Sequence, residues 1–145
     1  MEKFSRELQI RWSDLDPNGH LRHSVYYDWG TFCRISFFEH HQLSYNSLID
    51  MNIGIVSFRE ECVFRKEIRL GDKVTIELEL VKARRDFSRW SIRHNIFKNG
   101  DTLAAILTFD GAWIDLNKRK LTIPGGIVVN AFSLLPQAAD FNWTE

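Results

Sequence analysis

Four side chains that can hold or move a proton lie within ten positions of one another: Asp14, Asp16, His20 and His23. A carboxylate can activate water or attack a carbonyl itself, and an imidazole beside it can orient it or move a proton. The same atoms can ligate a metal, although no standard spacing such as HExxH occurs. The run at 16–19, Asp-Pro-Asn-Gly, is also typical of a plain turn. Acid–base catalysis, a metal site and a turn all remain open at this point.

A second chemically active segment, residues 82–93, contains five basic residues and one acidic residue. Arginine suits paired contacts with phosphate oxygens, and the candidates are Arg84, Arg85 and Arg89. Basic residues beside aromatic ones also occur in proteins that bind single-stranded nucleic acid. A solvated hairpin is the third interpretation. We expect Trp90, in the same segment, to lie in the core.

The composition limits the classes of protein to consider. The chain has 145 residues, 44% of them hydrophobic, which predicts one domain over residues 1–145. Its 19 Lys and Arg residues balance 19 Asp and Glu residues, so no overall positive field favours nucleic acid as a partner. The two cysteines make neither a disulfide framework nor a CxxC motif. Without a membrane-spanning run or a signal peptide in the sequence, we expect a cytoplasmic protein with no membrane insertion.

Hydrophobic periodicity predicts the elements that position these groups. A short strand at residues 5–12 leads through a turn-rich segment into a helix over 24–42, for which Ser24 is the expected N-cap. This helix is aromatic on more than one side, as is typical of a buried helix. A shorter helix is expected at 44–51.

The remainder of the chain reads as strands at residues 55–69, 74–80, 88–97 and 102–115. The first is too long to stay straight in a small domain, so we expect a bend or a bulge. Asn99-Gly100 supplies the positive φ angles of a tight hairpin. A five-stranded antiparallel sheet that curls around the apolar helix would bury it, which predicts an α+β fold. The core should span residues 5–125, with the apolar C-terminal extension 126–145 packed on the domain or on another subunit.

A family signature occupies residues 16–26, DPNGHLRHSVY. It resembles the D-x-x-G-H/V-x-x-N/H-x-x-Y pattern of the hotdog-fold acyl-CoA thioesterases, in the 4-hydroxybenzoyl-CoA thioesterase and YbgC-like group. Residues 68–74, 99–104 and 115–124 resemble that family's later motifs, in the right order. The resemblance implies a five-stranded antiparallel sheet wrapped around one long central helix.

The resemblance also implies a reaction, the hydrolysis of an acyl-CoA thioester to a carboxylic acid and free CoA. It places the catalytic carboxylate at Asp16, as general base or nucleophile, and an assisting group at His23. Backbone N–H groups at the start of the helix, including those of Ser24 and Val25, are candidate oxyanion donors, because peptide dipoles favour negative charge there. Gly19 would let the backbone approach the thioester closely.

Substrate-binding residues are expected along the rest of the chain. Basic residues of the corresponding family hairpin bind the CoA phosphates, often from the neighbouring subunit, which implies this role for Arg84, Arg85 and Arg89. The acyl pocket should lie between the helix and the facing strand, and its expected lining residues are Tyr27, Phe32, Phe58 and Phe64. These bulky side chains favour a short or aryl acyl group. Many members carry Tyr where this chain has Trp12, which can contact substrate but cannot act as a phenolic acid.

The family's quaternary structure implies a homodimer or homotetramer with active sites at the interface between two sheets. No cofactor is expected, since coenzyme A is part of the substrate, and neither a metal nor nucleic acid is an expected partner. Two alternatives keep the fold. One is an acyl-carrier-protein thioesterase, whose partner would present an acidic surface to the arginine hairpin. The other is a catalytically silent acyl-CoA-binding protein, which the Trp12 departure favours.

Overall fold

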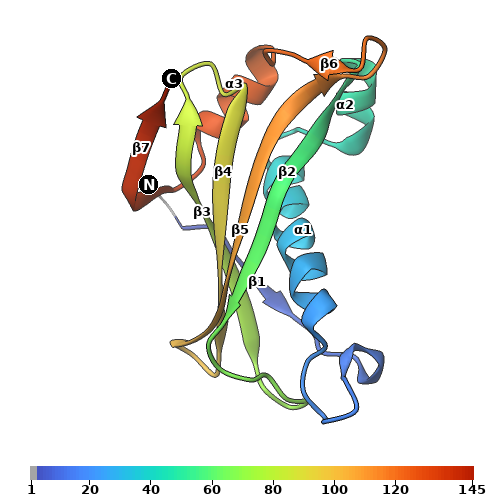
Figure 1. Ribbon diagram of the computed structural model, residues 1–145, viewed down its shortest axis with the longest axis vertical. Helices are drawn as coiled ribbons and strands as arrows, with labels where there is room; N and C mark the ends of the chain where they lie inside the picture. The colour runs from blue at the N-terminus through green and yellow to red at the C-terminus, as the bar shows by residue number, and fades with distance from the viewer. Residues whose placement is uncertain (1–2) are drawn as a thin grey trace.

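One long helix, α1 (His23–His40), lies against one face of a twisted sheet in the computed structural model, which describes residues 3–145 (Figure 1). Residues 1 and 2 of the expected domain lie outside the described residues. The main strands are antiparallel and follow the order β1-β3-β4-β5-β2. Their bounds are Ser5–Leu8 for β1, Ile53–Phe64 for β2, Val74–Arg84 for β3, Arg89–Lys98 for β4 and Thr102–Asp115 for β5. The predicted α+β architecture is confirmed.

Two predicted strands are too long. The first, expected at 5–12, ends at Leu8, and a short 3-10 helix, η1 (Trp12–Asp14), follows because the Asp14 carboxylate accepts a hydrogen bond from the Arg11 backbone N–H at 2.9 Å. The second, expected at 55–69, is β2 and ends at Phe64. The next two backbone N–H groups both donate to the Ala104 carbonyl, at 2.8 and 3.0 Å, which turns the chain out of the ladder. The expected bulge is present in β2, between Ser57 and Arg59.

Helix α1 packs so closely on the sheet that one turn needs glycine. A Cβ built on Gly30 would lie 2.1 Å from Cδ2 of Leu107 on β5, so a larger residue would fit only if the Leu107 side chain or the helix moved. The helix begins at His23, and its N-cap is Arg22 rather than the predicted Ser24. Arg22 is held extended because its backbone N–H donates to the Asp14 carbonyl at 2.7 Å. A second helix, α2 (Tyr45–Asp50), is capped by Ser44.

The C-terminal extension folds onto the same domain. It forms α3 (Gly126–Ser133) and β7 (Gln137–Thr144), after a two-residue strand β6 (Lys120–Leu121) that pairs with β5. Phe132 of α3 contacts the buried rings of Trp90 and Trp113, at centroid distances of 5.0 and 5.7 Å. Trp90 lies in the core as predicted. The five expected strands therefore become seven, and β7 departs from the antiparallel pattern because it runs parallel to β3.

The two long edges of the sheet differ. The outer edge of β3 pairs with β1 over its first residues and with β7 further along (Figure 1). The outer edge of β2 pairs with no strand in the described part of the chain, and three large apolar side chains there are about half exposed: Phe58, Val63 and Phe64. Among residues 3–145, no helix is long and apolar enough to cross a membrane.

Candidate active site

The segment between η1 and α1 forms a tight loop around Asp16. The Asp16 backbone N–H donates to the His20 carbonyl at 2.8 Å, and the Gly19 N–H donates back to the Asp16 carbonyl at 3.0 Å. Gly19 has a φ angle of +78°, a left-handed conformation that favours glycine. A side chain at Gly19 would meet open space, so the backbone angle and not crowding explains this glycine.

The same loop fixes the Asp16 carboxylate. Its Oδ1 accepts hydrogen bonds from the backbone N–H groups of Asn18, at 2.9 Å, and His20, at 3.1 Å. Both bonds use one oxygen, and no described residue donates a hydrogen bond to Oδ2. The carboxylate is therefore held in place by one oxygen while the other remains available for chemistry.

Asp16 and His23, the two predicted catalytic residues, line one hollow of about 320 Å³. Its wall comes from the loop, the first turn of α1, the end of β2 and the connection that follows β2: Asp16, His20, Leu21, His23, Tyr26, Phe64, Arg65, Lys66 and Glu67. His20 Nε2 lies 3.0 Å from the Glu67 carboxylate, which ties the loop to that connection. Burial raises the pKa of Tyr26 to about 12, so its hydroxyl stays protonated at neutral pH.

The first turn of α1 leaves backbone donors beside this hollow. No side chain caps the helix, so the N–H groups of His23 and Ser24 donate to no residue in the described structure. The prediction of Val25 as a third donor needs correction, because its N–H already donates to the Arg22 carbonyl at 3.0 Å. Two adjacent amides at the positive end of a helix can stabilise a developing oxyanion.

Several predicted or considered residues do not line the hollow. Asp14 is buried and bound to Arg11, whose hydrogen bond lowers the pKa of that carboxyl, and it serves to hold η1. Trp12 is 81% exposed, and Tyr27 is half-buried on α1. No group of three His, Cys, Asp or Glu side chains placed to hold a metal occurs within residues 3–145.

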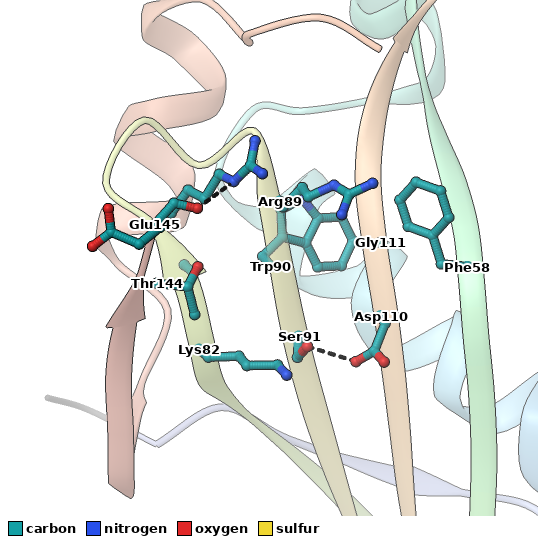
Figure 2. Close-up of a pocket in the computed structure, with 11 residues that line it drawn as sticks. Phe58, Lys82, Arg89, Trp90, Ser91, Asp110, Gly111, Thr144 and Glu145 are labelled. Carbon is teal, nitrogen blue, oxygen red and sulfur yellow. Dashed lines mark hydrogen bonds between the residues drawn. The ribbon is translucent and has the colours of Figure 1, made fainter.

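The predicted Arg89 lies at the other end of the sheet, on the face turned away from α1 (Figure 2). Arg84 and Arg89 line a hollow of about 520 Å³, together with Phe58, Lys82 and Ser91. The Arg89 guanidinium lies 4.6 Å from the centre of the Phe58 ring, which makes a combined aromatic and cationic surface. The Arg84 Nε donates to the Glu145 carbonyl at 2.6 Å.

Two further predicted residues need comment. Arg85 lies outside this hollow, with its guanidinium 5.0 Å from the centre of the Trp143 ring. Phe58 does not face the helix, as its predicted place in the acyl pocket requires. The bulge between Ser57 and Arg59 turns the Phe58 side chain to the outer face, beside Arg89.

The two hollows are far apart within one protomer. Phe64, at the first hollow, pairs with Ala105 of β5, while Arg89, at the second, pairs with Ala112 of the same strand. This separation along β5 corresponds to about 23 Å at ~3.3 Å per residue. One protomer therefore does not bring the predicted carboxylate and the predicted arginines into one site.

Sequence reasoning did not single out Arg65, Lys66 and Glu67, which line the first hollow, or the polar pair Arg34 and His94 in the core. For His94 a signal existed, because it lies between Ile92 and Ile96 on the buried face of an alternating strand. For Arg65, Lys66 and Glu67 the sequence contained no such signal, since charged residues after a strand are common.

Comparisons with known proteins agree with this architecture. The profile of the thioesterase-like superfamily matches residues 10–139, and no curated protein matches the sequence. A Staphylococcus aureus hypothetical protein, characterised in complex with CoA, is 18% identical with a TM-score of 0.87 over 99% of this chain and 90% of that one. A DHNA-CoA thioesterase from the same organism is 20% identical with a TM-score of 0.82 over 92% and 90% of the two chains. A Thermus thermophilus thioesterase, complexed with coenzyme A and Zn, is 26% identical with a TM-score of 0.74 over 92% and 97%.

Proposed function

Because the chain belongs to the thioesterase-like superfamily and has the hotdog fold, we propose that it hydrolyses an acyl-CoA thioester with the Asp16 carboxylate as its base or nucleophile. Thioester hydrolysis is the activity of the family. The residue roles and the CoA substrate are the proposal, and membership of the narrower YbgC-like group stays a prediction. CoA complexes among the similar structures support the choice of substrate.

One observation carries the proposal: Asp16 and His23 line a single hollow at the uncapped start of α1. Thioester hydrolysis needs a group that activates or replaces water and donors for the oxyanion. Asp16 Oδ2 supplies the first, and the N–H groups of His23 and Ser24 supply the second. The His23 side chain, exposed at the rim, can orient the carboxylate or move a proton.

The reaction can follow two routes from this arrangement. In the first, Asp16 takes a proton from water, the hydroxide adds to the carbonyl carbon, and the C–S bond breaks as the thiolate leaves and is protonated. In the second, Asp16 itself adds, the thiolate leaves, and water hydrolyses the resulting anhydride. Single turnover in ¹⁸O water can identify the second route, because only an anhydride that water attacks at the Asp16 carbonyl puts solvent oxygen into the Asp16 carboxylate and an enzyme oxygen into the product.

The arginine hollow is the proposed CoA phosphate site, with Arg84 and Arg89 as ligands and Phe58 available to stack on adenine. Since it lies about 23 Å from the Asp16 hollow along β5, we propose that a second copy of the chain supplies it. The unpaired, partly apolar edge of β2 supports a homodimer in which the two β2 strands pair antiparallel. Such pairing would bring the arginine end of one protomer toward the Asp16 end of its partner.

The deciding experiment measures thiol release from short, medium, long and aromatic acyl-CoAs by the wild type and by Asp16→Asn. Turnover that is lost in the variant, with folding and oligomeric state unchanged, is the expected result. Equal turnover by both proteins would contradict the role of Asp16. The absence of turnover with every CoA ester would contradict the substrate class and favour a silent acyl-CoA-binding protein or a carrier-protein thioesterase.

A second candidate substrate, an acyl group on acyl carrier protein, is favoured by one surface. Arg84 and Arg89 also line a hollow with Leu121 and Ile123, whose side chains are 52% and 67% exposed. A basic surface with apolar side chains fits an acidic amphipathic helix. Two results together would support this candidate. The carrier-protein thioester should be hydrolysed faster than the matched CoA ester, and Leu121→Ser should lose more activity with the carrier-protein ester than with the CoA ester.

A further inference from the structure

A third hollow, of about 600 Å³, lies at the opposite end of α1 from the Asp16 loop, between the helix end, β1 and the residue that ends α3. Its lining is aromatic and cationic: Lys3, Phe4, Ser5, Arg6, Phe37, His40, His41 and Leu134. Within residues 3–145, no Asp or Glu side chain lines it, whereas the Asp16 hollow contains two carboxylates. The volume lies in the range of sites that hold small organic ligands.

Four rings form the floor of this hollow. The Phe37 ring packs against the Phe4 ring at a centroid distance of 5.2 Å and against the His41 ring at 4.4 Å. His40 closes the circle, because its ring centre lies 5.0 Å from that of His41 and 6.2 Å from that of Phe4. Phe4 and Phe37 are buried, so the core holds the two imidazoles in place.

The two imidazoles do not serve as caps of the helix. The Phe37 and Phe38 carbonyls at the end of α1 already accept backbone N–H groups, including that of His41. In the described part of the chain, the histidine side chains that form hydrogen bonds or ion pairs are His20 and His94. Both imidazoles at this hollow are therefore available to a ligand.

The two permanent cations of the hollow are also weakly partnered. The Arg6 guanidinium lies 4.1 Å from the centre of the Phe4 ring and donates to the Ser5 carbonyl at 3.0 Å, which leaves most of its N–H groups free. The Lys3 side chain is 84% exposed, and its Nζ lies 4.0 Å from Oε1 of Glu77 on β3. An anion between these two side chains would replace contacts with water by charge-assisted hydrogen bonds.

The charges around the hollow favour an anion, and more so in acid. The nearby carboxylates are Glu77, beside Lys3, and Glu39, which is exposed on α1, and neither lines the hollow. Gathering like charges costs free energy, which a bound anion offsets. Burial and the neighbouring His40 lower the pKa of His41, so this imidazole is neutral at pH 7 and gains its charge below that pH.

We propose that this hollow binds the phosphate ester of a small ring compound, with the phosphate between Lys3 and Arg6. A phosphate monoester carries nearly two negative charges at pH 7, which matches the two permanent cations better than a single carboxylate does. The hollow has room for more than a phosphate, and the ring would lie against Leu134, whose side chain is 55% exposed. This ligand site does not depend on the proposed function, since 18 helical residues, or about 27 Å at ~1.5 Å per residue, separate it from the Asp16 loop.

Three probes test the site: phenyl phosphate, inorganic phosphate and phenol. Calorimetry measures affinity, and the histidine Hε1 resonances in proton NMR, assigned with His40→Gln and His41→Gln, report where each probe binds. We expect phenyl phosphate to move both resonances and to bind at least about tenfold more tightly than either other probe, because it makes the ionic and the apolar contacts together.

Charge variants locate the phosphate. Arg6→Gln should weaken the binding of phenyl phosphate about tenfold and Lys3→Gln severalfold, whereas Lys120→Gln, at an exposed lysine of β6, is the control and should keep the wild-type affinity. Because the arginine hollow can also hold phosphate, the titration is repeated in Arg84→Ala/Arg89→Ala. That variant should retain the movement of both histidine resonances.

The response to pH has its own probe. Phosphate esters take up a proton near pH 6, so phenyl sulfate, whose charge stays constant, is used instead. We expect its binding to tighten severalfold from about pH 7.5 to about pH 5.5, because a bound anion and a protonated imidazole stabilise each other. The double variant His40→Gln/His41→Gln should bind phenyl sulfate equally at the two pH values.

Three results would overturn the inference: histidine resonances that do not move with millimolar phenyl phosphate, unchanged affinity in both Arg6→Gln and Lys3→Gln, or equal affinity for phenyl phosphate and inorganic phosphate. None of these measurements involves thioester hydrolysis, so the proposed function stands or fails separately. Circular dichroism checks the folding of each variant. If Arg6→Gln does not fold, Lys3→Gln decides, because its side chain is exposed.

Discussion

The two ends of the sheet carry different chemistry and are built differently. At one end, Asp16 is fixed by backbone hydrogen bonds within a loop of a few residues, beside the unoccupied N–H groups of α1. At the other end, Arg84 and Arg89 line one hollow, and Arg89 lies on the outer face of the sheet. The first end has the rigidity that positioning a reacting atom requires, and the second has the long flexible cations that suit phosphate binding. This difference fits the proposed function, in which the first end cleaves the thioester and the second binds the substrate.

The sharpest test of this division is Asp16→Asn. Because Asn keeps an oxygen that can accept from Asn18 and His20 but loses the carboxylate, we expect kcat to fall by at least about 100-fold with little change in KM. Thiol release measures the rate, and thermal denaturation checks that the loop still folds. A variant that keeps more than a tenth of the wild-type rate would place catalysis elsewhere.

Mixed dimers show whether the two ends meet across chains. Asp16→Asn and Arg84→Ala/Arg89→Ala protomers, each nearly inactive at low substrate, are unfolded together and refolded. If the arginines act on the partner's Asp16, each heterodimer contains one intact site, and about a quarter of the wild-type activity should return, as random pairing of a symmetric dimer predicts. No recovery above the average of the two variants would mean that each protomer uses its own arginines.

Substitution of one arginine should separate substrate binding, measured by KM, from thioester cleavage, measured by kcat. Arg89→Ala removes a phosphate ligand and the cation over Phe58, so we expect KM for acyl-CoA to rise about tenfold while kcat changes little. Arg59→Ala is the matched control, because Arg59 is exposed on β2 and paired with Glu61 at 2.6 Å. A fall in kcat with an unchanged KM would assign the arginine end to chemistry instead.

Acid should lower the free energy of unfolding of the whole domain, because the group that responds to it, His94, is buried in the middle of the sheet. Burial lowers the pKa of His94 to about 3, so between pH 6.5 and 3 the unfolded chain binds a proton that the folded chain does not. The stabilisation is complete above pH 6.5 and is lost as the pH falls. Between pH 7.5 and pH 6 we expect the free energy of unfolding to fall by about 0.8 kcal/mol, or about fourfold in the unfolding constant.

Urea denaturation at several pH values measures this loss. His94→Gln should flatten the slope, while His40→Gln, at an exposed histidine, should keep it. An unchanged slope in His94→Gln would show that another group accounts for the acid sensitivity.

The smallest effect is expected at Trp12. Its side chain is 81% exposed and lines neither hollow, so Trp12→Phe should change kcat/KM by no more than about twofold. A larger loss, measured by the same thiol assay, would show that a second protomer or the substrate covers this side chain and would extend the Asp16 end.

The difference between the ends also explains what sequence could predict. Asp16 and His23 are close in sequence, so one local motif predicts their common hollow. The face to which Phe58 points depends on one inserted residue in β2, and a bulge leaves no fixed position in the hydrophobic pattern. The β7 pairing escaped prediction for a related reason, because its partner β3 lies more than 50 residues earlier and its parallel register has no turn to mark it.

The two strands that share the outer edge of β3 have a consequence for assembly. The antiparallel β1 occupies four residues and the parallel β7 eight, so a strand approaching from that side meets two short segments of opposite direction rather than one continuous ladder. Within residues 3–145, β2, with 12 residues, is the one long strand with an edge that pairs with no other strand. If two chains pair through β2, neither sheet keeps a second long edge, so we expect the sheet to add one partner and then stop growing, which would guard against fibre formation.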